Sequence, residues 1–131
     1  MKPPESCQDL LDRPLFAHLG TVRTDGAPLV NPMWFLYDSE QNVIRLTHTR
    51  SRSNYRYLQA EPRVALAITD PEDQYRYLQV RGIVEKEEAD PTGAFYQTLQ
   101  QRYRGKTSEV KDRDERVIFT IRPTAWKARQ P

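Results

Sequence analysis

The residues from 48 to 56 carry the side chains best suited to chemistry, because they read His-Thr-Arg-Ser-Arg-Ser-Asn-Tyr-Arg. Arginines, hydroxyls and an amide side chain are the groups that bind phosphate. A strand is expected to end here and a helix to begin, so free backbone N–H groups and the helix dipole also favour an anion. The alternative is a capped helix with a solvated basic face, since the chain has no Walker-type or dinucleotide glycine pattern.

A second run with chemical potential is Asn-Pro-Met-Trp-Phe at 31–35. Pro32 cannot donate to a strand ladder, so we expect an edge strand or a bulge there. An amide beside flat apolar side chains could hold a planar ring system. The alternative is a bulged edge strand with aromatic core residues. Trp34 and Phe35 point to opposite faces of a strand, so both are buried only if something covers the second face.

Other kinds of site have little support. We find no nucleophile beside a base, no paired carboxylates and no metal-ligand spacing around His18, His48 and Cys7. His18 is expected to be a packed or surface histidine in a strand. No catalytic side chain is predicted, and an enzyme with this inventory would leave the reaction to a cofactor while the protein supplies position and electrostatics.

Composition restricts the class of protein. With 20 basic and 18 acidic residues the charges nearly cancel, so we expect neither nucleic acid nor a membrane surface as a partner. No apolar run approaches the roughly 20 residues of a membrane helix. The single Cys7 forms no internal disulfide and is expected to be a free thiol in a frayed N-terminus. Without a signal peptide, we expect a cytoplasmic location.

Hydrophobic patterning predicts one domain, 1–131, that is mainly β. Asp25-Gly26 between apolar runs is a hairpin signal, and Gly105 is expected to end a helix that Asp90-Pro91 begins. Tight turns join most strands, so we expect six to seven antiparallel strands coiled into a small barrel with three short helices. The helices are predicted at 6–11, 51–60 and 91–104, and the strands at 15–23, 29–37, 43–48, 64–68, 75–85, 116–122 and 124–128.

The motifs resemble a known family. Leu-Phe-Ala-His-Leu-Gly-Thr-Val-Arg-Thr-Asp-Gly-Ala-Pro at 15–28 and Val-Asn-Pro-Met-Trp-Phe at 30–35 are similar to the pyridoxamine 5′-phosphate oxidase-like split-barrel superfamily, whose fold is the split β-barrel of FMN-binding type. The segments 49–58, 61–66 and 101–105 resemble its actinobacterial branch, whose members bind the 8-hydroxy-5-deazaflavin coenzyme F420. The resemblance extends from about Leu10 to Lys127.

The resemblance implies a homodimer with two equivalent cofactor sites at the subunit interface. One strand would run along the ring system, with Asn31, Pro32, Met33 and Trp34. The next segment would hold the ribityl chain and phosphate, with Thr47, His48, Thr49, Arg50, Ser51, Arg52, Asn54 and Arg56. The other subunit would contribute Tyr75, Tyr77 and Trp126.

Three functions remain open. The first is an F420-dependent reductase that passes a hydride from C5 of the coenzyme to a small unsaturated molecule. The second is an FMN-dependent oxidase or reductase on the same fold. The third is a protein that binds the coenzyme, or haem or another tetrapyrrole, without turnover.

Overall fold

A computed structural model describes residues 1–130, and seven strands form one antiparallel sheet in the order β2-β1-β5-β6-β7-β4-β3. The strands are β1 (Ala17–Val22), β2 (Pro28–Met33), β3 (Leu36–Asp38), β4 (Val43–Thr49), β5 (Arg63–Asp70), β6 (Asp73–Ala89) and β7 (Arg116–Arg129). The helices are α1 (Gln8–Asp12), α2 (Ser53–Ala60) and α3 (Ala94–Arg104), with short 3₁₀ turns η1 (Glu5–Cys7) and η2 (Arg113–Glu115). None of these helices is both long and apolar enough to cross a membrane.

The two edge strands of the sheet are neighbours in the chain. β2 and β3 lie at opposite ends of the strand order, yet only Trp34 and Phe35 separate them. Because a link of this length spans at most about 11 Å, the sheet must coil until its edges approach each other. The expected split barrel is therefore confirmed, while the single strand predicted at 29–37 is wrong. The chain stays apolar or aromatic from Met33 to Tyr37, where it changes edges, so the pattern does not reveal the break.

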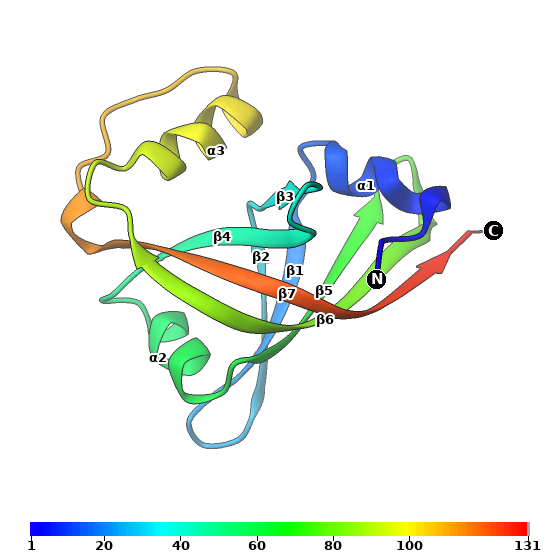
Figure 1. Ribbon diagram of the computed structural model, residues 1–131, viewed down its shortest axis with the longest axis horizontal. Coiled ribbons are helices and arrows are strands. Elements are labelled where there is room, and N and C mark those ends of the chain that lie inside the picture. Colours follow the sequence, from blue (N-terminus) through cyan, green and yellow to red (C-terminus); the bar gives the residue numbers. More distant parts are fainter. Residues whose placement is uncertain (131) are drawn as a thin grey trace.

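The inside of the coiled sheet holds the core. Alternate residues of each strand point inward, and Leu19, Leu46, Leu66, Val80 and Phe119 are at most 2% exposed. In Figure 1, α2 lies below the sheet, while α1 and α3 lie along its upper side. The helices therefore cover the openings that a short coiled sheet leaves.

Two side chains of α3, Tyr103 and Arg102, hydrogen-bond to the backbone at Phe35, in the link between the two edge strands. The Tyr103 hydroxyl accepts from the Phe35 N–H at 3.0 Å and lies 2.7 Å from the Leu15 carbonyl. Arg102 donates to the Phe35 carbonyl at 3.1 Å and to three carbonyls after α1 and within it. Polar backbone groups that the coiled sheet leaves unpaired at Phe35 are thus satisfied by α3.

The two ends of α3 lie near the expected sequence signals, but the helix begins later in the chain than predicted. The Asp90 carboxylate accepts from the N–H groups of Phe95 and Tyr96, so it caps the helix as predicted. The helix nevertheless begins at Ala94 instead of Pro91, because Gly93 takes a left-handed conformation with φ of 74°. Gly105 ends α3, with φ of 72° and its N–H bonded to the Gln101 carbonyl.

The last strand is longer than its sequence suggests. We expected Pro123 to break it, but β7 continues through Pro123 because the residue pairs with Gly82 at a register shift in β6. A Cβ at position 82 would lie 2.6 Å from the Ile121 methyl group, so the two strands approach each other most closely where the bulge lies.

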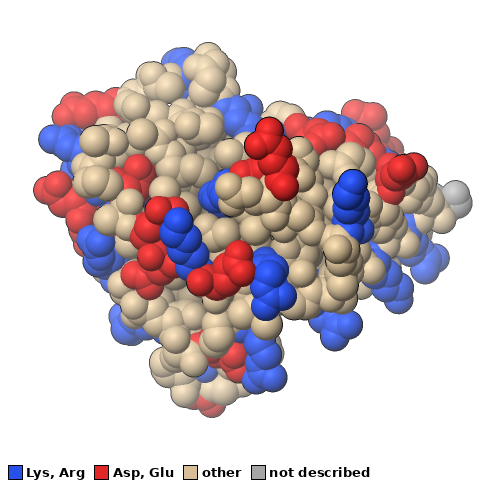
Figure 2. All heavy atoms as spheres, viewed as in Figure 1, with Lys and Arg blue, Asp and Glu red and all other residues tan. Residues whose placement is uncertain are grey.

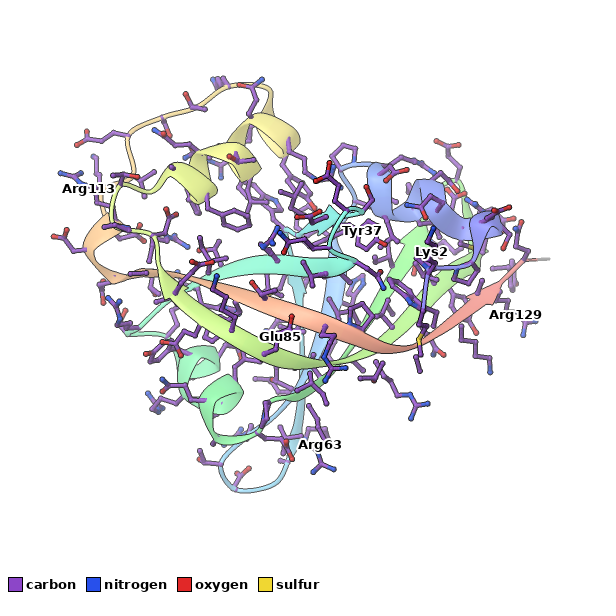
Figure 3. All side chains as sticks on the ribbon, in the orientation of Figure 1. Lys2, Tyr37, Arg63, Glu85, Arg113 and Arg129 are labelled. Atoms are coloured by element: carbon purple, nitrogen blue, oxygen red, sulfur yellow. The ribbon has the colours of Figure 1, made fainter. Side chains whose placement is uncertain are left out.

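Acidic and basic side chains alternate on the face that β6 and β7 present in Figure 2. Glu85, labelled in Figure 3, pairs with Arg122 at 3.2 Å, and Lys86 pairs with Glu88 at 3.5 Å. These pairs are solvent-exposed, so they add little stability.

The N-terminal segment is packed and not frayed, which makes the expectation for Cys7 wrong. Cys7 is fully buried as a free thiol, 3.9 Å from the Tyr77 carbonyl. Arg76 holds α1 in place by pairing with both Asp9 and Asp70, and this guanidinium lowers the pKa of the Asp9 carboxyl. A tertiary ion pair of this kind leaves no local signal in the sequence.

Candidate functional site

The two runs chosen from the sequence meet in one groove of about 230 Å³, here called the β4 groove. Its walls come from the end of β2, the end of β4, the residue before α2, the first turn of α3 and the start of β7. The lining residues are Pro32, Met33, Trp34, Thr47, His48, Thr49, Arg52, Tyr96 and Arg116.

Sheet pairing explains why these residues converge. In the ladder between β4 and β7, Thr49 lies opposite Arg116, so the start of β7 is beside the end of β4. The chain turns from β4 straight into α2, and the Asn54 side chain donates to Asn31 of β2 at 3.4 Å. That contact connects the two predicted segments across the barrel opening.

His48 is the most perturbed titratable group of the groove. It is 5% exposed, and its Nε2 is buried with no hydrogen-bond partner among residues 1–130. Burial lowers the pKa of His48 to about 4, and the nearby charges of Arg116 and Arg52 act in the same direction. The imidazole is therefore neutral at pH 7, and the positive charge of the groove comes from the two arginines.

The start of α2 adds partial positive charge. Arg52 precedes the helix, and no side chain of the described residues caps it. The first N–H groups of the helix are free to bind an anion, and the helix dipole favours one there. The hydroxyls of Thr49 and Ser51 lie 3.4 Å apart on the same turn. Of the three arginines predicted at this turn, only Arg52 lines the groove, and Ser51 lies beside Thr49 without lining it.

Several predicted residues lie outside the walls of the groove. Arg50 donates to the Asp114 carbonyl at 2.9 Å, so its guanidinium holds η2. Asn31 and Asn54 bond to each other beneath the groove, and Arg56 is exposed further along α2. These side chains support the groove or lie beside it.

The three residues assigned to a partner subunit lie away from the β4 groove. Tyr75 is 74% exposed at the start of β6, and Tyr77 is half-buried on the same strand. Trp126 packs against the core, with its ring edge-on to Tyr37 at 6.1 Å, which Figure 3 labels beside β3. Its indole Nε1 is buried without a partner among the described residues.

Sequence reasoning missed Tyr96 and Arg116. The Arg116 guanidinium lies 4.0 Å above the Tyr96 ring and forms two bonds with the Asp112 carboxylate, at 2.9 and 3.0 Å. Both residues reach the groove through pairings between distant parts of the chain. Trp34 was predicted, but its ring stacks on Tyr103 at 4.9 Å and 9°, so one face of the indole is already covered.

A second hollow, of about 670 Å³, lies on the outer face of the sheet. Two cross-strand rows run over β2, β1, β5, β6 and β7, and directly opposite residues point to the same side. We call these ten residues the outer-face rows: Val30, Gly20, Ala65, Arg81 and Ala125 in one, and Pro32, His18, Ala67, Gln79 and Lys127 in the other. Nine of the ten residues line the hollow; Pro32 instead lines the β4 groove, and Trp126 joins the hollow's lining.

This combination of fold and site defines a split-barrel protein with a groove that contains two arginines. The chain belongs to the pyridoxamine 5′-phosphate oxidase family, whose pattern matches residues 3–130. It is similar to a solved F420 reductase, with 52% identity and a TM-score of 0.89 over 95% of this chain and 98% of that one.

More distant structures share the fold. A putative pyridoxamine 5′-phosphate oxidase from Listeria innocua has 16% identity and a TM-score of 0.74, covering 95% of each chain. The heme storage protein HutZ from Vibrio cholerae has 15% identity and a TM-score of 0.70, covering 98% of this chain and 96% of that one. No curated protein matches the chain.

Proposed function

We propose that this protein is an F420-dependent reductase that transfers a hydride to a small unsaturated organic molecule. The observation that carries the proposal is the 52% identity to an F420 reductase over nearly the whole of both chains. The β4 groove supports it, because its cationic and hydroxyl groups match the phosphate of a deazaflavin coenzyme. An FMN-dependent enzyme would bind its phosphate through the same groups. The binding experiment below distinguishes these two cofactors.

The groove residues fit a phosphate group in charge and hydrogen bonding. Arg52 and Arg116 supply cations, and the uncapped start of α2 supplies N–H donors. Thr49 and Ser51 can donate from their hydroxyls, and neutral His48 has an unpartnered ring nitrogen. When bound, the deazaflavin supplies a hydride from C5 of its ring. The chain's own part is to bind the anion and hold the ring in place.

We also propose that two copies pair through the outer-face rows. Gly20, Ala65, Ala67 and Ala125 have small or absent side chains in the hollow, so a second sheet can approach closely at these positions. Pairing over this face would cover the hollow on the outer face of the sheet. We expect Tyr75 and Tyr77 of β6 to contribute to the cofactor site of the partner subunit. We expect this homodimer in the cytoplasm, where the Cys7 thiol stays reduced.

A binding experiment tests the function. The purified protein is titrated with coenzyme F420 and separately with FMN, and binding is followed by cofactor fluorescence. Micromolar or tighter binding of F420 with no binding of FMN supports the deazaflavin reductase. The reverse preference favours the FMN enzyme, and indifference to both contradicts the proposal. Turnover is then measured as oxidation of reduced F420 with a panel of activated alkenes and imines, which separates a reductase from a coenzyme carrier.

A further inference from the structure

Arg116 of the β4 groove is already paired with a carboxylate, that of Asp112. Arg116 lines the β4 groove, and the Asp112 carboxylate occupies the edge of its guanidinium formed by Nε and Nη2. Asp112 comes from the segment between α3 and β7, and Figure 3 marks that segment with Arg113. The pair is a bidentate fork of the kind that arginine also forms with phosphate.

We propose that Asp112 is a built-in competitor for the phosphate of the ligand, so that binding exchanges the Asp112 carboxylate for a phosphate on Arg116. This rests on the proposed function in taking the coenzyme phosphate as the ligand. Asp112 is then a specificity-determining residue, since a weakly charged ligand cannot displace it.

The geometry favours exchange over simple addition. A carboxylate and a phosphate present the same pair of acceptor oxygens, and two anions on one guanidinium edge repel each other. The side chain of Asp112 is 42% exposed, so it can leave into water, whereas that of Arg116 is only 14% exposed. The Tyr96 ring, 4.0 Å from the guanidinium, keeps Arg116 in place when its carboxylate leaves.

The charge of the groove depends on this exchange. Its lining contains two cations, Arg52 and Arg116, and no carboxylate, while His48 is neutral. Asp112, just outside the lining, neutralises one of the two cations. The departure of Asp112 therefore makes both arginines available to the phosphate of the ligand.

The backbone that follows Asp112 is held by Arg50, so the exchange requires only that the Asp112 side chain moves. Arg50 binds the Asp114 carbonyl through its side chain and the Glu115 carbonyl through its backbone N–H, at 2.9 and 3.1 Å. Arg50, which the sequence placed on the phosphate, thus has a different contact here: it fixes the backbone that presents Asp112.

The test compares two variants that change net charge equally. Asp112→Asn removes the competitor, and Asp114→Asn removes a carboxylate from the same exposed turn without touching Arg116. Binding of inorganic pyrophosphate and of coenzyme F420 is measured by calorimetry at constant ionic strength. We expect Asp112→Asn to tighten both by roughly three- to tenfold and Asp114→Asn to change them less than twofold. The deazaflavin that carries the ribityl chain but no phosphate should bind equally to all three proteins.

A double variant shows whether the effect passes through Arg116. In an Arg116→Gln background, Asp112→Asn should have no further effect on pyrophosphate binding. Unchanged or weaker pyrophosphate binding in Asp112→Asn, or no pyrophosphate binding to any variant, overturns the inference. If pyrophosphate responds as expected but F420 does not bind, the exchange stands and the proposed function fails. If F420 binds the parent protein and neither ligand responds to Asp112→Asn, the function stands and the exchange fails.

Discussion

Replacement of His48 should remove a large part of the acid sensitivity of this fold. The pKa of His48 is lowered from 6.5 to about 4 by burial, then by Arg116 and Arg52. The unfolded chain therefore binds this proton more tightly than the folded one, and stability falls as pH drops through this interval. The loss from this one group is about 2 kcal/mol between pH 7 and pH 5 and about 3 kcal/mol once pH is below both pKa values.

The chain contains its own control, because its two histidines differ in burial within one protomer. His18 is exposed on β1, whereas His48 is 5% exposed. Because His18 lies in the outer-face rows, the comparison is made at a protein concentration at which light scattering detects monomers. Urea unfolding is measured at pH 7 and pH 5, at one protein concentration, for the parent, His48→Gln and His18→Gln. We expect the parent and His18→Gln to lose about 2 kcal/mol more than His48→Gln across this interval.

Two results would refute this reasoning. One is an equal loss of stability in His48→Gln and the parent, which would assign the acid sensitivity to other groups. The other is an NMR titration in which the His48 ring protonates with a midpoint above pH 6. Carboxylates such as Asp9 add to the acid loss, but they do so equally in all three proteins.

Three further predictions concern the groove, the split and the proposed dimer. Arg52→Ala should weaken F420 binding by about 1–3 kcal/mol, whereas Arg122→Ala, which removes an exposed arginine paired with Glu85, should leave it unchanged; equal affinities by fluorescence titration would contradict the phosphate assignment. Tyr103→Phe keeps the stack on Trp34 but leaves the Phe35 N–H without its acceptor, so urea unfolding should detect a loss of about 1–3 kcal/mol, and an unchanged stability would contradict this role. Ala67→Arg places a long cation in the outer-face rows and should convert a dimer into a monomer by light scattering, a result that an unchanged mass would rule out.

Local signals in the sequence predicted the elements that local chemistry governs. Asp25 and Gly26 form the expected turn, with φ of 86° at Gly26, and Gly105 ends α3 in a left-handed conformation. Pro32 lies in an edge strand as expected. At each of these positions the residue type itself restricts the backbone, so neighbours along the chain suffice for the prediction.

Features that depend on distant pairing were not predictable in the same way. The continuation of β7 through Pro123 depends on Gly82 across the ladder, and the burial of Cys7 depends on the docking of the whole N-terminal segment. Tyr96 and Arg116 enter the groove only because α3 and β7 meet the end of β4. The sequence therefore indicated the segments 31–35 and 48–56 as parts of the site, but not the wall that Tyr96 and Arg116 form.

The position of β7 in the sheet determines when the two parts of the sheet can join as the chain is synthesised on the ribosome. β7 is the last strand to be synthesised, yet it lies between β6 and β4. Before residue 116 emerges, β2-β1-β5-β6 and β4-β3 are two separate sheets with no shared ladder. Since Arg116 is the first residue of β7, the nascent chain gains the second cation of its groove in the same step that joins the two sheets.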